Sequence, residues 1–290
     1  MPIGAENSFI TKASKKQIIS GLTLEVDRPI YKNETGSRNF TFTTDLKPAI
    51  NNKNTRHTCR SPDNLPERVP CIAIVIYGLG KSAAATRTAI QELPGEITLA
   101  FWPHSKETDN WIAAANAAGH EALIIISMEP RTHRGRNLPL NINEASYTIT
   151  EFRNRLKWIL ERERSYVGTM SIMGSHFTSS PSHMQIVFSE LKKNNLLFLR
   201  QQTINTVIIS SIPGVSAASS TYSSLYLDQE ASRNAIDRKL IEIERIANLK
   251  GKIIVFGFPY PVTFERLKRW IDKLETKNLK LVPISYFSME

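Results

Sequence analysis

The chain has 290 residues, 41% of them hydrophobic and 22% charged, which is enough to bury the core of one large α/β domain or two small ones. Its net charge of +10 suits a polyanionic partner, but solvated basic surfaces are the simpler explanation, and no zinc-finger, ribonucleoprotein or basic-zipper motif predicts specific nucleic-acid recognition. No apolar run reaches the length of a signal-peptide core or a membrane span, so we expect a protein that is cytoplasmic or whose export segment lies outside this sequence.

Residues 1–68 predict a polar, mostly irregular N-terminal extension. They are rich in Asn, Thr, Ser and Lys, and prolines punctuate their second half. One or two short strands are expected, around 22–26 and 40–43. We interpret this part as a tether, and residues 69–290 as the main domain.

Beyond Pro70, short apolar runs alternate with helical stretches. The expected strands are 72–76, 97–101, 122–126, 167–171, 196–199, 215–219, 253–256 and 279–284. The expected helices start at Ser82, Ser105, Pro181 and Pro261, or span 147–163, 204–211 and 229–249. This alternation predicts βαβ units around a parallel sheet, either a barrel or a doubly wound sheet.

The first of these strands runs from Cys71 directly into the turn Tyr77-Gly78-Leu79-Gly80. Ligands and chemistry collect at the carboxyl ends of parallel strands, yet this turn holds no acid, histidine or nucleophile. The following Gly80-Lys81-Ser82 is too short for a phosphate-binding loop, because Val75 stands where that loop needs its first glycine. The pattern therefore predicts a strand, a tight turn and a Ser-capped helix.

Neither of the two cysteines has the spacing of a metal site. Cys71 opens a buried strand, so we expect an inert core thiol. A disulfide with Cys59 would form only in an oxidising compartment.

Four groups of polar or aromatic residues are candidates for a functional site. His104 and His176 follow predicted strand ends, and Glu129 lies at the same edge of the sheet. The basic loop 131–136 suits carboxylates, phosphates or sugars, and the turn 257–263 offers an aromatic wall. One carboxylate without an acid partner or a metal does not make a hydrolase.

Taken together, nine segments occur in an order that resembles the divergent polysaccharide deacetylase family of bacterial envelope proteins. They are Ile72–Ile76, Leu99–Pro103, Ala118–Glu121, Met128–Pro130, Val167-Gly168, Met173-Gly174, Leu196–Leu199, Gly257–Thr263 and Glu265–Leu267. The resemblance covers roughly residues 70–290. It implies a distorted (β/α) barrel of the polysaccharide-deacetylase type and a role in carbohydrate or cell-envelope metabolism.

The resemblance also implies a divalent metal, zinc in type, held by an aspartate that closes the first strand and by histidines at later strand ends. Such a metal lowers the pKa of its bound water from about 15.7 to about 7. In this chain the aspartate pair is replaced by Tyr77-Gly78. Where members carry histidines it has Ile125, Ile172 and Phe258, and where an aspartate often follows the 196–199 strand it has Arg200.

We therefore expect a degenerate member that keeps the barrel, has lost the metal and its hydrolytic activity, and retains at most a cleft for a glycan or an envelope protein. The residues expected to line that cleft are Tyr77, Gly78, Pro103, His104, Met128, Glu129, Gly174, Ser175, His176, Arg200 and Tyr260. The resemblance places the protein in the cell envelope or periplasm. The sequence does not indicate an oligomeric state.

Two other functions stay open. An active deacetylase or amidase would need a relocated metal site built from His104, His176 and Glu129, with ligands about 2.0–2.2 Å from one point. A polyanion-binding scaffold would need the arginines of 131–136, 153–155 and 162–164 to share one face.

Overall fold

The computed structural model describes two strands near the N-terminus and most of the chain beyond Pro70. The described residues are 12–19, 22–29, 69–128, 141–142, 149–161, 165–173, 181–201, 205–209 and 219–288. The chain divides into two compact units, residues 1–46 and 47–290. In the first unit, β1 (Lys12–Ile19) and β2 (Leu22–Pro29) form an antiparallel hairpin. The strand expected at 22–26 is confirmed as part of β2, whereas the one expected at 40–43 lies outside the described residues.

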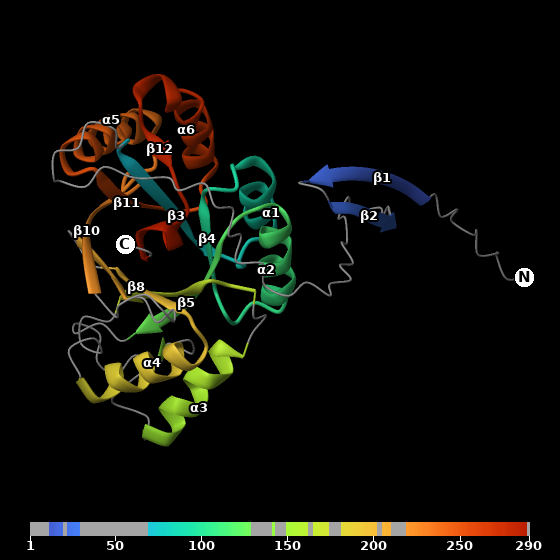
Figure 1. The fold of residues 1–290 in the computed structure, drawn as a ribbon, viewed down its shortest axis with the longest axis vertical. Helices are drawn as coiled ribbons and strands as arrows, with labels where there is room; N and C mark the ends of the chain where they lie inside the picture. The colour runs from blue at the N-terminus through green and yellow to red at the C-terminus, as the bar shows by residue number, and fades with distance from the viewer. Residues whose placement is uncertain are drawn as a thin grey trace, which may run out of the picture. The chain divides into compact units, whose positions relative to one another are not determined.

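The second unit is built on one strongly curled sheet (Figure 1). Its strands are β3 (Cys71–Leu79), β4 (Thr98–Phe101), β5 (Ala122–Met128), β6 (Asn141–Ile142), β7 (Gly168–Met173), β8 (Leu197–Gln201), β9 (Asn205–Ile209), β10 (Ser219–Tyr226), β11 (Lys252–Gly257) and β12 (Lys280–Leu281). They follow the order β3-β4-β5-β7-β8-β9-β10-β11, and β11 pairs again with β3. The strands thus close on themselves, which confirms the expected distorted (β/α) barrel.

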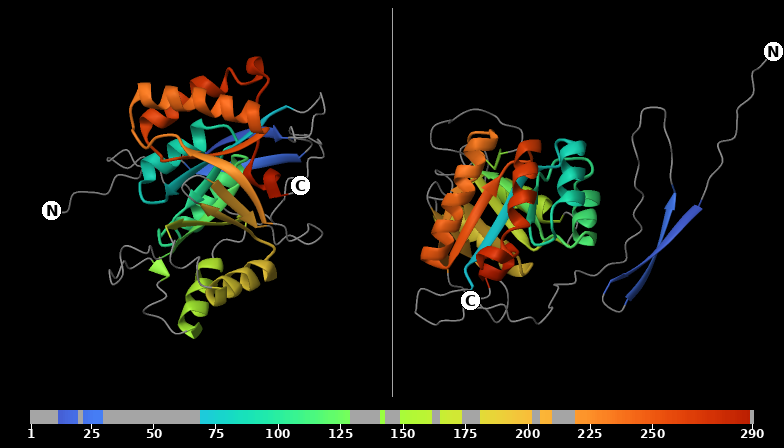
Figure 2. Two further views of the ribbon diagram at one scale, coloured as in Figure 1. Left: turned by 90° about the vertical axis from the view of Figure 1, so that its left-hand side faces the viewer. Right: turned by 90° about the horizontal axis from the view of Figure 1, so that it is seen from above.

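Helices lie outside the strands, as Figures 1 and 2 show from different sides. They are α1 (Ala83–Glu92), α2 (Thr108–Ala117), α3 (Ile149–Leu160), α4 (Pro181–Lys193), α5 (Arg233–Lys250) and α6 (Pro261–Ile271). Among the described residues, no helix combines the length and the hydropathy needed to cross a bilayer.

Strand alternation divides the buried apolar side chains into two clusters. Along β3, Ile72, Ile74 and Ile76 belong to the cluster that packs beneath the helices. The intervening side chains, from Cys71 to Tyr77, belong to a second cluster inside the barrel. Because successive side chains of a strand point to opposite faces, a continuous apolar run fills both layers, as expected of a strand buried on both sides.

One predicted helix is wrong. Residues 204–211 were expected to be helical, but residues 205–209 form β9, which runs antiparallel between β8 and β10. The segment Asn-Thr-Val-Ile-Ile is rich in β-branched side chains, which favour strands. The next strand was also placed too early, because β10 spans Ser219–Tyr226 and not 215–219.

The helix starts were predicted with mixed success. The Ser82 hydroxyl accepts a hydrogen bond from the backbone N–H of Ala85, so Ser82 caps α1 as expected. Pro181 and Pro261 are the first residues of α4 and α6. Ser105, however, does not cap α2, which begins at Thr108, and the Thr108 hydroxyl instead donates to the Ser105 carbonyl over 2.9 Å.

The expected closing strand at 279–284 is mostly absent. Only Lys280 and Leu281 pair with β3, and a 3-10 helix, η3 (Ile284–Ser288), follows. Ile284 and Phe287 of this segment are fully buried in the barrel interior. The Ile284 amide donates to the hydroxyl of Thr98, at the start of β4. The C-terminal segment therefore closes the end of the barrel where the strands begin, and the carboxyl ends of the strands form the opposite end.

Cys71 is fully buried and takes part in a disulfide, so the expectation of an inert free thiol is wrong. The other cysteine of the sequence, Cys59, lies outside the described residues. Because a disulfide persists in oxidising compartments, this bond bears on where the protein functions.

Gly168 is required by a close approach between β7 and β8. A Cβ at this position would lie 2.4 Å from the Leu197 carbonyl oxygen. We predict that Gly168→Ala lowers the free energy of unfolding by at least about 2 kcal/mol, because a backbone atom cannot move aside as a flexible side chain can. Gly119→Ala is the control: its φ of +94° is strained for alanine, but its nearest neighbour would be 3.9 Å away. Urea unfolding measures both, and equal midpoints for Gly168→Ala and the wild type would contradict this account.

Candidate functional site

The carboxyl end of β3 turns sharply toward α1. Gly78 has a φ of +90° and Gly80 a φ of +92°, values at which a side chain is strained. The register between β3 and β4 shifts between Tyr77 and Leu79. The Gly80 amide donates to the Thr86 hydroxyl over 2.9 Å, so this turn is closed by its own helix. That arrangement agrees with the predicted strand, turn and Ser-capped helix.

The four residues that we expect to replace the family's metal ligands all lie in the interior cluster or pack against it. Tyr77 and Ile172 are at most 7% exposed, Ile125 is fully buried, and the partly buried Phe258 packs against the same interior cluster. The Tyr77 and Phe258 ring centroids are 4.4 Å apart. Hence Tyr77 and Phe258, far apart in the sequence, are in contact, and Ile125 and Ile172 belong to the same interior layer.

This cluster does not fit the divalent metal that the resemblance implies. Zinc takes Cys, His or carboxylate ligands, and harder cations take oxygen ligands. Isoleucine and phenylalanine provide neither, and Tyr77 contributes a single phenol. In the part of the chain that the structure describes, no group of three or more His, Cys, Asp or Glu residues is placed to hold a metal ion.

Aromatic rings surround Gly78. A Cβ at Gly78 would lie 3.9 Å from both the Phe258 ring and the Trp102 indole nitrogen. The Lys81 ammonium lies 4.0 Å from the Trp102 ring centroid, a cation–π contact. Tyr260 is 41% exposed and its ring lies 5.5 Å from that of Phe258. We call Tyr77, Trp102, Phe258 and Tyr260 the aromatic rim.

The other predicted site residues that the structure describes lie beside this rim or away from it. Pro103 is buried, and His104 is half-buried with its ring stacked on Trp158 of α3 at 5.0 Å. Alternation along β8 gives Arg200 the same side as Phe198, which packs beneath the helices. Arg200 is therefore not part of the interior cluster.

The remaining predicted residues lie largely outside the described part of the chain. Met128 ends β5, where its backbone pairs with Ile142 and Met173, but its side chain is not described. Glu129, Gly174, Ser175 and His176 fall outside the described residues. The relocated metal site of His104, His176 and Glu129 thus stays a prediction.

The sequence analysis missed Asp228, the buried carboxylate nearest the rim. Asp228 is 3% exposed and follows β10. Its Oδ2 accepts hydrogen bonds from the Phe258 amide over 2.8 Å and the Thr263 hydroxyl over 2.7 Å. Its Oδ1 has no hydrogen-bond partner among the described residues. An acid two residues after a strand was the signal, and placing that strand at 215–219 in place of Ser219–Tyr226 concealed it.

Asp228 positions the loop that carries the aromatic rim. The first turn of α6 has no side-chain cap of its own, and a carboxylate near a helix N-terminus is favourable. By binding both Phe258 and Thr263, Asp228 fixes the loop between β11 and α6. Burial raises the pKa of the Asp228 carboxyl, and the hydrogen bonds from Thr263 and Phe258 oppose that rise.

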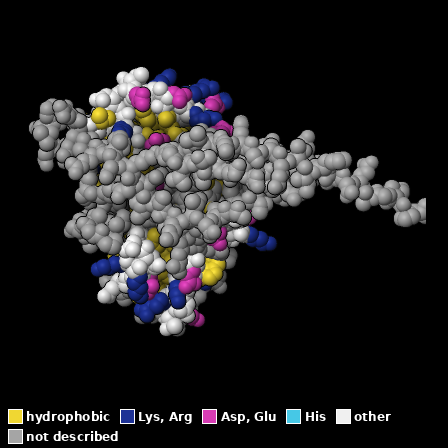
Figure 3. All heavy atoms as spheres, turned by 45° about the vertical axis from the view of Figure 1, so that its right-hand side comes forward, with side chains coloured by type: hydrophobic (Ala, Val, Ile, Leu, Met, Phe, Trp, Pro, Cys, Tyr) yellow, Lys and Arg dark blue, Asp and Glu magenta, His cyan; other side chains and the backbone are white. Residues whose placement is uncertain are grey.

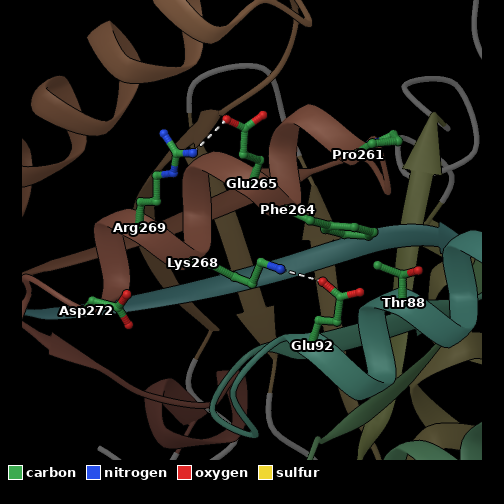
Figure 4. A pocket seen from close by; sticks show the side chains of 8 residues that line it. All are labelled: Thr88, Glu92, Pro261, Phe264, Glu265, Lys268, Arg269 and Asp272. Atoms are coloured by element: carbon green, nitrogen blue, oxygen red, sulfur yellow. Dashed lines mark hydrogen bonds and ion pairs between the residues drawn. The ribbon is translucent and has the colours of Figure 1, made fainter.

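A separate pocket of about 430 Å³ lies outside the barrel, between α1 and α6 (Figure 4). Its lining residues are Thr88, Glu92, Pro261, Phe264, Glu265, Lys268, Arg269 and Asp272. Lys268 pairs with Glu92, and Glu265 pairs with Arg269 and with Arg233 of α5. Because these charges neutralise one another, the pocket directs no strong field at a ligand, and its ion pairs join the helices.

A family model described as divergent polysaccharide deacetylase matches residues 74–287. The chain belongs to this family. The predicted resemblance is thereby confirmed.

Two other proteins are similar to this chain. The uncharacterized protein YibQ of Escherichia coli is 26% identical over 204 residues, which are 70% of this chain and 63% of YibQ. The chain thus spans less than two thirds of that relative's length. The crystal structure of the uncharacterized protein ATU2773 from Agrobacterium tumefaciens has a TM-score of 0.64 and 26% identity, and the match covers 78% of this chain and 92% of that one. Neither name carries an activity.

We predict that restoring a carboxylate at the end of β3 destabilises the protein. Tyr77→Asp would bury a charge beside Phe256 and Phe258 and leave a cavity, at a cost of about 3–5 kcal/mol in the free energy of unfolding. The control Tyr77→Phe keeps the ring and should cost no more than about 1 kcal/mol. Unfolding in urea with and without zinc measures both. A Tyr77→Asp variant that is as stable as the wild type and takes up zinc would refute the apolar assignment.

We also predict that ionisation of Asp228 lowers the free energy of unfolding as the pH rises. The carboxyl pKa is about 3.9 in an unfolded chain and higher in the folded protein, so the folded state binds the proton more tightly. The contribution of Asp228 to the free energy of unfolding therefore falls as the pH rises from the carboxyl pKa of the unfolded chain to that of the folded protein. Asp228→Asn removes the charge and keeps an acceptor, so its stability relative to the wild type should increase between pH 4 and pH 8.

Asp228→Ala is the matched comparison. It leaves the Phe258 amide and the Thr263 hydroxyl without their acceptor, which should cost about 1–3 kcal/mol at any pH in that range. Urea midpoints at several pH values test both variants. If the free energies of unfolding of Asp228→Asn and the wild type differed by the same amount at every pH, Asp228 would not titrate as described.

Proposed function

We propose that this chain is a family member that keeps the barrel without metal-dependent deacetylation, and that its aromatic rim binds glycans of the cell envelope. The observation that carries this proposal is that Tyr77, Ile125, Ile172 and Phe258, which the resemblance aligns with the family's metal ligands, belong to or pack against one apolar interior cluster. Hydrolysis of an amide needs an activated water, and a metal supplies it by lowering the pKa of that water by several units. A dication in this apolar cluster would lose its hydration without gaining ligands.

The aromatic rim supports the binding half of the proposal. Exposed aromatic side chains offer flat apolar surface at low conformational cost, with a polar group at the edge of tyrosine. Sugar rings present C–H faces of matching size and hydroxyls around them. Tyr260 is exposed and Phe258 is held in place by Asp228, so the platform is preformed. The Lys81 ammonium at its edge suits a glycan with carboxylate groups.

A location in the envelope is supported by two observations. The family resemblance points to envelope proteins, and the disulfide of Cys71 requires an oxidising compartment to persist.

Two measurements on the purified protein test the loss of catalysis. Elemental analysis after incubation with zinc should find no stoichiometric metal. Acetate release from oligomers of N-acetylglucosamine should equal that of the buffer, in an assay where an active metal-dependent deacetylase serves as the positive control. Stoichiometric zinc together with acetate release would overturn the proposal and favour the relocated site of His104, His176 and Glu129.

Glycan binding is tested separately by calorimetry with soluble peptidoglycan fragments. Tyr260→Ala should weaken binding roughly tenfold, which corresponds to the loss of about 1.4 kcal/mol. Ile241→Ala, at an exposed position of α5 (65% exposed), is the matched control and should leave binding unchanged. No binding by the wild type would refute the glycan-binding half alone. Binding that is lost only at high salt and is insensitive to Tyr260→Ala would favour the polyanion scaffold.

A further inference from the structure

The outward side of α5 carries an unusual combination of side chains. The helix buries Ala235, Ile236, Leu240, Ile243 and Ala247 against the rest of the domain. On its opposite side, Arg238, Ile241, Arg245 and Leu249 recur at intervals of three and four residues, so they form one stripe. We call these four residues the α5 outer face.

The two aliphatic members are more exposed than any other large hydrophobic side chain that the structure describes. Ile241 is 65% exposed and Leu249 is 70% exposed, whereas Trp158 and Tyr260 are 42% and 41% exposed. Single exposed aliphatic residues are common on protein surfaces. Two on one helix stripe, each next to an arginine in that stripe, need a further explanation.

The acidic residues of α5 do not neutralise this face, because each is engaged elsewhere. Asp237 accepts hydrogen bonds from Arg266 of α6, and Glu242 pairs with Lys239. Glu244 binds the Trp270 indole N–H and Lys277. Asp237 and Glu244 are thus directed away from the stripe, and Glu242, which borders it, is paired with Lys239. The four residues of the stripe themselves include two cations and no acid.

Arg238 and Arg245 are both exposed. Their side chains form no ion pair or hydrogen bond with any residue in the described ranges. Figure 3 shows basic and acidic side chains interspersed at the end of the second unit formed by α5 and α6. The uncompensated cations of that end include the two arginines of the stripe.

We propose that the α5 outer face docks on an anionic lipid surface. A helix that alternates basic and aliphatic side chains on one side is the pattern of interfacial membrane binding, in which aliphatic side chains enter the headgroup region and cations contact the phosphates. The stripe from Arg238 to Leu249 spans about 16 Å of helix at 1.5 Å per residue. Because the buried side of α5 is already packed on the barrel, docking requires no folding of the helix.

The charge and the apolar exposure of the α5 outer face together favour a lipid surface over a second copy of the chain and over a soluble polyanion. A second copy of the chain, docked by the same face through a two-fold axis, would oppose arginines to arginines with no acid between them. A soluble polyanion would use the arginines but leave Ile241 and Leu249 in water. A lipid surface accommodates both kinds of side chain.

Vesicle binding of the full-length chain tests the proposal. The wild type should cosediment with vesicles of 30% phosphatidylglycerol in phosphatidylcholine and not with pure phosphatidylcholine. Each cation near an anionic leaflet strengthens binding about fivefold, so Arg238→Gln with Arg245→Gln should weaken the partition roughly 25-fold. Ile241→Ala with Leu249→Ala should weaken it at least about fivefold, since it removes the apolar insertion. Lys106→Gln with Lys192→Gln removes two exposed cations elsewhere and should change binding less than threefold.

Three results would overturn the proposal. The first is no binding to the anionic vesicles. The second is equal loss for the stripe variants and for the control pair, which would show a dependence on net charge alone. The third is a wild-type dimer by light scattering that Ile241→Ala with Leu249→Ala dissociates, which would assign the face to self-association. All four α5 substitutions are at exposed positions of a helix, and circular dichroism confirms that each variant is folded.

Discussion

The pairing of β11 with β3 is the constraint on which the rest of the domain depends. It aligns six residue pairs in parallel, from Lys252 with Cys71 to Gly257 with Ile76, and it turns an open sheet into a closed barrel. Closure creates an interior that only side chains can fill, and it brings the ends of the first and last large strands together. Tyr77 and Phe258 are in contact because of this pairing, although 180 residues of sequence separate them.

Once the barrel is closed, the chemistry at its carboxyl end follows from what the interior holds. A metal-dependent enzyme accepts polar ligands in this position and satisfies them with the ion. Here the interior at this end is filled by apolar and aromatic side chains, and their close packing contributes to local stability. Asp228, a deeply buried carboxylate beside this end, accepts hydrogen bonds from the backbone and a hydroxyl of the next loop. It thereby holds the rim that we propose for glycan binding.

The distortion of the barrel explains most of what sequence reasoning placed wrongly. An antiparallel strand, β9, stands where a crossover helix belongs in a regular (β/α) repeat. The expectation of strict alternation therefore turned a β-branched segment into a helix and moved β10 toward the N-terminus. That error removed Asp228 from the strand end, and with it the site residue that the pattern of Leu-Asp after a strand would otherwise have indicated.

The amino-acid sequence alone determined the family and the alternation of strands and helices beyond Pro70, because these depend on residue identity and short-range periodicity. It also predicted which positions replace the metal ligands. Only the tertiary structure decided that Tyr77 packs against Phe258 in the interior layer that also holds Ile125 and Ile172, that Arg200 lies apart from that layer, and that α5 exposes arginines beside aliphatic side chains. Those facts depend on strand register, barrel closure and helix orientation, which are set by contacts between residues far apart in the chain.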